Sequence, residues 1–332
     1  MTAPFPLGRR AALRAAGAAP LLGILPRPAR AEPVLDRVAR MVVGYPAGGA
    51  ADVIARLFAE RLRGLYAPQV IVENRTGASA RLAVDAVRKA APDGTTMLFT
   101  PEAVFTIYPH TYPKSVRYDA WADFAPVSGL SVSVFGFVVD AKHPARDLDG
   151  FVRWAREQGE VPYATPSAGS TLHFLTEQMA RSRGLRMQHV AYRGTGPALL
   201  DMAGGRLAAV TAVLSDVMEG HRAGTMRILA ITAAARSPKL PDVPTFAELG
   251  YPEQSAEAWY AMLLPGGTPA PIVEGLQRAI ETATRDPQLR DALLQLEQAP
   301  LGTTAAALAE RLRAERDRWG PIVRDTGYTA EE

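Results

Sequence analysis

Residues 43–52 read Val-Gly-Tyr-Pro-Ala-Gly-Gly-Ala-Ala-Asp, and this stretch decides how the chain folds. An apolar run at 41–43 ends in a turn rich in proline and glycine, and an amphipathic segment begins at Asp52. This order predicts a strand, a tight turn and the start of a helix. The first N–H groups of a helix have no intrahelical acceptor, and the helix dipole adds partial positive charge. The turn is therefore a candidate binding site for an anion.

The same pattern of strand, glycine turn and helix returns at 163–171 and at 190–198. In open α/β sheets, ligands bind beyond the carboxyl ends of the strands. Two such turns facing each other would present two helix N-termini to one anion. Each charge-assisted hydrogen bond there typically contributes about 1.5–3 kcal/mol.

Helical and strand patterns alternate along the rest of the chain, which predicts an α/β protein. Strands are predicted at 70–72, 95–99, 124–139 (as two strands or one), 162–165, 188–192, 207–213, 227–232 and 259–264. Helices are predicted at 52–66, 80–90, 148–158, 171–183, 197–202, 271–285 and 304–326. With 332 residues the chain is long enough for two domains. We expect it to enter the second domain within 124–139 and to return at 259–264.

The first 31 residues resemble an export signal. Arg9-Arg10 precede an apolar run at 15–25, and Ala29-Arg30-Ala31 places small residues at −3 and −1 of a cleavage site. The arginine pair favours a twin-arginine signal, and the general secretory route is the alternative. Because the run is too short to span a bilayer, we expect cleavage after Ala31 rather than a retained anchor, and a periplasmic protein.

Composition excludes several classes of function. The signal holds five arginines and no acid, so the remainder has 32 basic and 34 acidic residues, a net charge of about −2. No cluster of Lys and Arg with aromatic residues indicates nucleic-acid binding. The chain has no cysteine, which removes thiolate chemistry and disulfides. Its five histidines are scattered, so we expect no metal and no cofactor.

Eight segments along the chain carry a family resemblance when they are taken together. They are, in order, YPAGGAAD, VIVENRTGA, APDGTTMLF, YATPSAGSTLHF, HVAYRGTGPALLDMAGGRL, AGTMRILAIT, LPDVPTFAELGY and WYAMLLPGGTP. The same order is found in the Bug receptors, and the chain resembles that family over about residues 38–328. These receptors are extracytoplasmic solute-binding proteins of the tripartite tricarboxylate transporter type.

The resemblance implies a two-lobed periplasmic-binding-protein fold, type II-like, with a ligand cleft between the lobes and hinge strands. Lobe 1 would comprise 32–125 plus 260–332, and lobe 2 would comprise 126–259. The resemblance also implies a small organic acid as ligand, membrane permease subunits as partners and a monomeric receptor. The ligand would be held mostly by main-chain N–H groups and water.

The ligand-binding residues expected from the turns and from the resemblance come from both lobes. They are Tyr45, Ala47, Gly48, Gly49, Ala50, Ala51, Asp52, Glu102, Ser167, Gly169, Ser170, Thr171, Tyr192 and Thr195.

Several of these side chains have a structural alternative. Asp52 suits helix capping better than ligand contact, and Ser170 suits both. Tyr45 could contact the ligand or cover the core. We expect His173 to be structural and Arg193 to lie at the surface. Glu102 is expected to be a solvated loop acid, with ligand contact as the alternative.

The chain departs from the family pattern at three places. Ala50-Ala51 replaces the Ser, Thr or Gly pair that relatives usually carry before the aspartate. Ala208 and Ala212 stand where the cleft-facing strand of lobe 2 often has an acid. Glu102 stands where a small polar residue is usual. These departures favour a ligand with an apolar body, or one with a cation near Glu102.

Two other functions remain as alternatives. A receptor of the same fold could act on a signalling partner instead of a permease. A hydrolase would need Ser170 to be aligned with a base. There is no Gly-x-Ser-x-Gly at that serine, and His173 is only three residues away on the same helix. We therefore expect that the protein is not an enzyme.

Overall fold

The computed structural model describes residues 33–254 and 258–328. The export signal predicted at 1–31 lies outside the described residues and stays a prediction.

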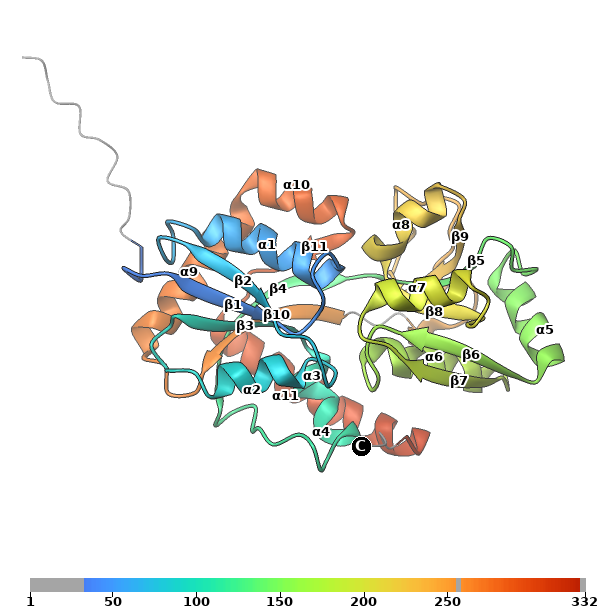
Figure 1. The fold of residues 1–332 in the computed structure, drawn as a ribbon, viewed down its shortest axis with the longest axis horizontal. Coiled ribbons are helices and arrows are strands. Elements are labelled where there is room, and N and C mark those ends of the chain that lie inside the picture. Colours follow the sequence, from blue (N-terminus) through green and yellow to red (C-terminus); the bar gives the residue numbers. More distant parts are fainter. Residues whose placement is uncertain (1–32, 255–257, 329–332) are drawn as a thin grey trace, which may run out of the picture. The chain divides into compact units, whose positions relative to one another are not determined.

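The described strands form two sheets, which are drawn with their helices in Figure 1. The first sheet has the order β11-β4-β10-β3-β1-β2, with β1 (Ala39–Val43), β2 (Val70–Asn74), β3 (Thr96–Pro101), β4 (Phe124–Ser133), β10 (Ala258–Pro265) and β11 (Gln298–Pro300). The second has the order β7-β6-β8-β5-β9, with β5 (Phe135–Asp140), β6 (Glu160–Thr165), β7 (Arg186–Ala191), β8 (Ala209–Val213) and β9 (Met226–Ile231).

Each sheet combines parallel and antiparallel pairs. In the first sheet β1 runs parallel to β2 and β3, and β10 is antiparallel to both β3 and β4. In the second sheet β6 runs parallel to β7 and β8, and β5 is antiparallel to β8 and β9. The parallel strands bring the turns that follow β1 and β3 to one edge of their sheet, and those after β6, β7 and β8 to one edge of theirs.

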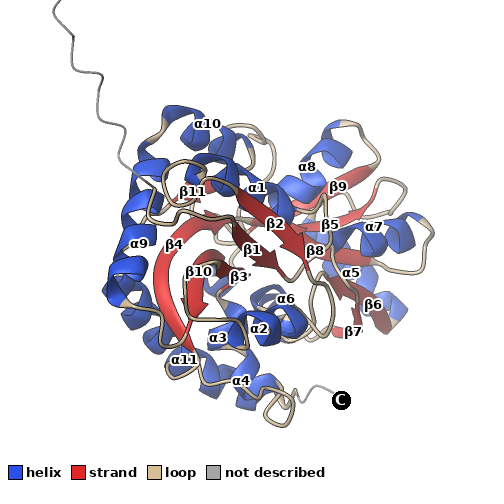
Figure 2. Ribbon diagram, turned by 60° about the vertical axis from the view of Figure 1, so that its left-hand side comes forward, coloured by secondary structure: helices blue, strands red, loops and turns tan. Residues whose placement is uncertain are grey.

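Helices cover both faces of the first sheet because its strands are apolar on both sides (Figure 2). Met41 and Val43 of β1 pack with α1 (Ala50–Leu62), α9 (Ala270–Arg285) and α10 (Pro287–Gln295). Val42, which points the opposite way, packs with α2 (Arg81–Arg88), α3 (Ala103–Thr106) and α11 (Ala305–Thr326). A strand that is buried on both faces reads as a continuous apolar run.

The second sheet is also covered by helices on both of its faces. Phe137 and Val139 of β5 pack with α5 (Leu148–Gln158) and α6 (Thr171–Ser182). Val138 packs on the opposite face with α7 (Thr195–Ala203) and α8 (Leu214–Arg222). Successive side chains of a strand point to opposite faces, so β5 serves two cores.

Side-chain caps set several helix starts. Asp147 accepts a hydrogen bond from the Gly150 N–H at 2.6 Å and starts α5. Asp286 accepts from the Gln288 N–H at 2.7 Å before α10, and Thr304 accepts from the Ala307 N–H at 3.2 Å before α11. Each cap satisfies an N–H group that the helix itself cannot.

Segment 124–139 forms two strands in different sheets, so the chain changes sheet at Val134 between β4 and β5. It has returned to the first sheet at β10. The sequence did not predict α8, α10 or β11, nor the 3₁₀ helix Pro252–Gln254. Residues 101–113, for which the sequence predicts a loop or a short helix, contain α3 and α4 (Tyr108–Thr111). The lobe limits at 125/126 and 259/260 stay a prediction. Among the described helices, none combines the length and apolarity needed to cross a membrane.

We predict that Gly44→Ala, directly after β1, destabilises the fold. An added Cβ would lie 2.3 Å from the Ala80 Cβ and 2.7 Å from its Cα, so the backbone must move. Overpacking of this kind costs about 1–3 kcal/mol, measurable by urea denaturation. Gly196→Ala is the control, because its Cβ would meet no atom within 4 Å. Equal midpoints for the two variants would contradict the prediction.

Candidate functional site

A cavity of about 420 Å³ is lined by the turns at the carboxyl ends of β1, β3, β6, β7 and β8. Residues from the strands that lead from one sheet to the other complete it, namely Ser133, Phe135 and 258–260. The carboxyl ends of parallel strands are the usual place for a ligand in α/β proteins. This cavity is therefore the candidate site.

The turn after β1 is held by Asp52, in the first turn of α1. Asp52 is buried, and its Oδ2 accepts the Gly48 N–H at 2.9 Å while Oδ1 accepts from Asn74 at 2.9 Å. Burial alone would raise the pKa of Asp52, but hydrogen bonds from Arg56, Gly48 and Asn74 outweigh it and leave the pKa lowered. Gly48 has a φ of +84°, a left-handed conformation that favours glycine. Asp52 does not line the cavity, so it orients the turn from within the first turn of α1. The capping alternative was wrong, because the N-cap residue of α1 is Gly49 and no side chain caps this helix.

The turn after β6 places the start of α6 at the cavity. Ser170 is the N-cap residue, but its hydroxyl donates to the Ser167 carbonyl at 2.7 Å instead of capping the helix. The N–H groups of Thr171 and Leu172, at the first two helical positions, have no intrahelical acceptor. Both residues line the cavity. The predicted helix N-terminus is thus present and the prediction of Ser170 as its N-cap residue is confirmed, but the Ser170 side chain makes no capping hydrogen bond.

Glu102 was expected to be a solvated loop acid, and this was wrong. It is 1% exposed; its Oε1 accepts from the Thr171 hydroxyl at 2.6 Å and its Oε2 from the Trp259 N–H at 3.0 Å. Burial raises the pKa of Glu102 to about 7, with the nearby charge of Glu315 adding to the rise. Thr171 belongs to the second sheet's helix α6, so Glu102 joins groups from both sheets.

Asp216, in the first turn of α8, also joins groups from both sheets, in this case at the start of α1. Its Oδ1 accepts the Ala50 N–H at 2.9 Å, and its Oδ2 accepts from the Thr195 hydroxyl at 2.6 Å. Burial raises the pKa of Asp216, although the hydrogen bonds from Thr195 and Ala50 oppose the rise. The N–H group of Ala50, one of the predicted ligand donors, is thereby bonded to a carboxylate of the protein itself.

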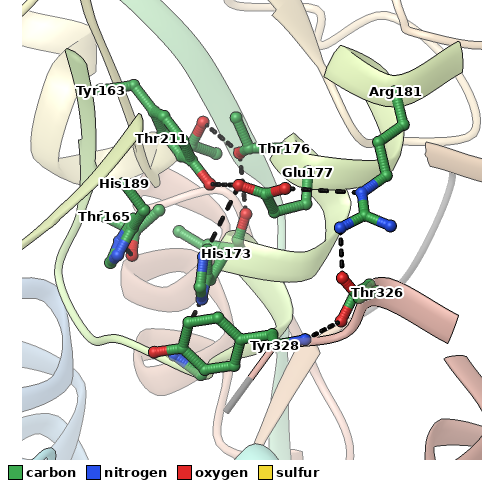
Figure 3. A network of polar contacts seen from close by, with 12 residues as sticks. Tyr163, Thr165, His173, Thr176, Glu177, Arg181, His189, Thr211, Thr326 and Tyr328 are labelled. Carbon is green, nitrogen blue, oxygen red and sulfur yellow. Dashed lines mark hydrogen bonds and ion pairs between the residues drawn. The ribbon is translucent and has the colours of Figure 1, made fainter. Parts of the chain in front are cut away.

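The expectation that His173 is structural is confirmed by its contacts, which lie in the network of Figure 3. It is 1% exposed, and its Nδ1 accepts the Gly169 N–H at 3.1 Å. Its ring stacks on His189 at 3.9 Å between centroids. Burial, reinforced by His189, holds the pKa of His173 well below its ordinary value, so the ring is neutral and supports the turn before α6.

The sequence-predicted residues fall into two groups. Those that line the cavity are Tyr45, Ala47, Gly48, Gly49, Ala50, Ala51, Glu102, Ser170, Thr171 and Thr195. Asp52, Ser167, Gly169 and Tyr192 do not line it. Ser167 instead bonds to the Tyr108 hydroxyl at 2.6 Å, and the Tyr192 hydroxyl donates to Asp201 at 2.5 Å.

Sequence reasoning missed many lining residues. They are Pro46, Pro101, Ala103, Ser133, Phe135, Pro166, Leu172, Gly194, Gly196, Pro197, Leu199, Val213, Asp216, Ala258, Trp259 and Tyr260. Seven of these sixteen lie directly next to a predicted residue in the chain, namely Pro46, Pro101, Ala103, Pro166, Leu172, Gly194 and Gly196. The signal that could have found Asp216 is its position just after an apolar strand, where the other turns of the site begin.

The expectation that Ala208 and Ala212 face the cleft was wrong. Ala212 is buried in the core formed with α7 and α8, and Ala208 packs against the opposite core. Neither lines the cavity. The acid on this side is Asp216, which follows the strand instead of lying within it.

The lining has two acids, Glu102 and Asp216, and none of the described lining residues is Lys, Arg or His. Large apolar side chains supply much of the remaining surface, among them Phe135, Leu172 and Trp259. Among the described residues no group of three or more potential metal ligands occurs. Main-chain N–H groups and hydroxyls are therefore the donors that the cavity offers an anion.

We predict that Glu102→Gln changes how stability depends on pH. Because the folded protein raises the pKa of Glu102 from 4.5 to about 7, the stability linked to its neutral form is complete below about pH 4.5. That stability is lost as the pH rises through about 7. The loss is at most about 3 kcal/mol.

The measurement is the free energy of unfolding of both proteins from pH 5 to 8. The wild-type value should fall relative to the variant across this range, since glutamine keeps the shape without the charge. The difference between the two proteins removes the contributions of other titrating groups. Parallel curves would refute a buried, shifted Glu102.

Comparison with known proteins gives consistent matches over nearly the whole described chain. A sequence model of the tripartite tricarboxylate transporter family receptor matches residues 54–328. Protein BugT of Bordetella pertussis is 34% identical over 301 residues, covering 90% of this chain and 92% of BugT.

Two solved structures that contain ligands have the same fold. MatC from Rhodopseudomonas palustris with bound malate is 29% identical with a TM-score of 0.80, covering 86% of this chain and 99% of MatC. R. palustris Rpa4515 with adipate is 28% identical with a TM-score of 0.83, covering 88% and 98%. Together with the two sheets around one cavity, these matches confirm the two-lobed binding-protein fold. The chain belongs to the tripartite tricarboxylate transporter family receptors, the group that includes the Bug proteins.

Proposed function

We propose that this protein is a periplasmic solute-binding receptor that captures a small carboxylate and delivers it to a tripartite tricarboxylate-type permease. The observation that carries the proposal is one cavity lined by the starts of α1 and α6, which flank different sheets. Helix N-termini bind anions without needing cationic side chains. The malate and adipate bound to the related receptors have carboxylate groups, which supports this ligand class.

The first turn and α6 would share the carboxylate. The candidate donors are the N–H groups of Gly49, Ala51, Thr171 and Leu172, with bridging water. A few charge-assisted hydrogen bonds of about 1.5–3 kcal/mol each are enough for micromolar affinity, which requires about 8 kcal/mol. The loss of side-chain hydroxyls at Ala50-Ala51 leaves these main-chain donors intact.

The proposal also includes export of the protein to the periplasm and docking on a membrane permease. The signal at 1–31 would direct the chain to the periplasm. There the lobes 32–125 plus 260–332 and 126–259 would close on ligand, and the closed monomer would dock on the permease. Ligand binding would shift the population of open and closed forms.

Binding rather than catalysis fits the polar groups at α6. The Ser170 hydroxyl donates to a main-chain carbonyl, and the His173 Nδ1 accepts the Gly169 N–H. A serine nucleophile needs a base hydrogen-bonded to its oxygen. Ser170 and His173 have other partners, so the hydrolase alternative lacks its central contact.

We predict that at least one acid in a panel of mono-, di- and tricarboxylates raises the midpoint of thermal unfolding. A ligand at 100 times its Kd adds about 2.7 kcal/mol to the folded state. Each acid is paired with its neutral amide, which should have no effect. A response to neutral solutes with none to any acid would contradict the proposed ligand class.

We predict that Thr171→Pro weakens binding of the acid by about tenfold or more relative to Thr171→Val. Both variants lose the hydroxyl, but only proline also removes the N–H group. Proline is favoured at the first helical position, and Ser170 before it is extended (φ −87°, ψ 170°), so α6 should persist. Titration calorimetry gives both affinities. Equal affinities of the two variants would show that the Thr171 N–H group does not bind the ligand.

A further inference from the structure

The two helix starts at the cavity do not offer the same chemistry. At α6, the N–H groups of Thr171 and Leu172 have no intrahelical acceptor. At α1, the Ala50 N–H already donates to Asp216 at 2.9 Å. A carboxylate of the protein thus occupies a position next to the α1 N-terminus that a ligand carboxylate would otherwise favour.

A ligand that carries a second negative charge would find no cationic side chain in the described lining of the cavity to pair with that charge. Asp216 and Glu102 both line it, and its described lining contains no Lys, Arg or His. Like charges a few ångströms apart repel, and the repulsion grows as water is excluded. A dicarboxylate with one end at α6 would bring its other carboxylate into this acidic environment.

Asp216 also retains unused acceptor capacity. Each of its oxygens accepts one hydrogen bond, from Ala50 and from Thr195. A carboxylate oxygen can accept two, so one position remains on each oxygen. The side chain is held in place from two sides and faces the cavity. This arrangement suits a ligand group that donates N–H bonds and carries positive charge.

We propose that Asp216 makes this receptor selective for ligands that combine one carboxylate with a hydrogen-bond donor, above all an ammonium group, and that it disfavours dicarboxylates. The proposal rests on the proposed function and names the substrate class of the same site. Malate and adipate, held by the related receptors, are dicarboxylates, so this chain would differ from them in ligand class.

The test compares two series that share a carbon chain and one carboxylate. The ω-amino acids with four to eight carbons carry an ammonium group at the far end, and the matching α,ω-diacids carry a second carboxylate. Titration calorimetry at one pH gives their affinities for the purified wild-type protein. The tightest amino acid should bind at least tenfold more strongly than the tightest diacid.

Two variants assign the preference to a residue. Asp216→Asn keeps an oxygen for the Ala50 N–H and removes the charge, and it should reduce the preference to less than threefold. Glu219→Gln makes the same change of charge on the same helix, at an exposed residue that pairs with Arg222, and should keep the full preference. The wild-type comparison is valid even where a variant fails to fold.

The outcomes separate the two proposals. Diacids that bind as tightly as the amino acids overturn the role of Asp216 and leave the proposed carboxylate receptor standing. A preference that survives in Asp216→Asn overturns the assignment to this residue. Failure of every carboxylate, including those of the wider panel, overturns the proposed function and this inference together.

Discussion

Three acidic side chains accept hydrogen bonds from main-chain N–H groups around the cavity, two of them at the start of α1 and one in β10. Asp52 accepts from Gly48, Asp216 from Ala50 and Glu102 from Trp259. A buried N–H without an acceptor costs about 1–3 kcal/mol, so the turns depend on these acids. Glu102 and Asp216 each also accept a threonine hydroxyl of the second sheet's helices. The interactions that complete the backbone therefore also hold the two sheets together at the site.

The same acids give the cavity its electrostatic character. The cavity has two acids and no cation among its described lining residues, so the anion binding proposed for it would depend on oriented main-chain dipoles. Burial opposes the charge of Glu102, and this cost is tolerated because both of its oxygens are hydrogen-bonded. Stability and ligand choice are thus connected through the protonation of the same side chains.

The sequence predicted the elements that depend on local pattern. The turn after β1 and the start of α6 lie where glycine and the apolar periods placed them, because strand, turn and helix each have a short-range signal. The burial of Glu102 could not be predicted, since its partner Thr171 is 69 residues away. Asp216 was not predicted as a lining residue, because α8 follows β8 without an intervening turn to mark the position, and its partner Ala50 is 166 residues away. Contacts between distant segments decide both cases.

Main-chain donors have a consequence for how such a receptor can evolve. Every residue except proline carries a main-chain N–H group, so substitution of Ala51 or Leu172 by any other residue leaves the donor in place. Under the proposed function, mutations at Phe135 or Trp259 would then alter which molecules are accepted while the main-chain donors stay in place. Gene duplication followed by substitution of these side chains would then be a short route from one receptor to several paralogues that bind different nutrients.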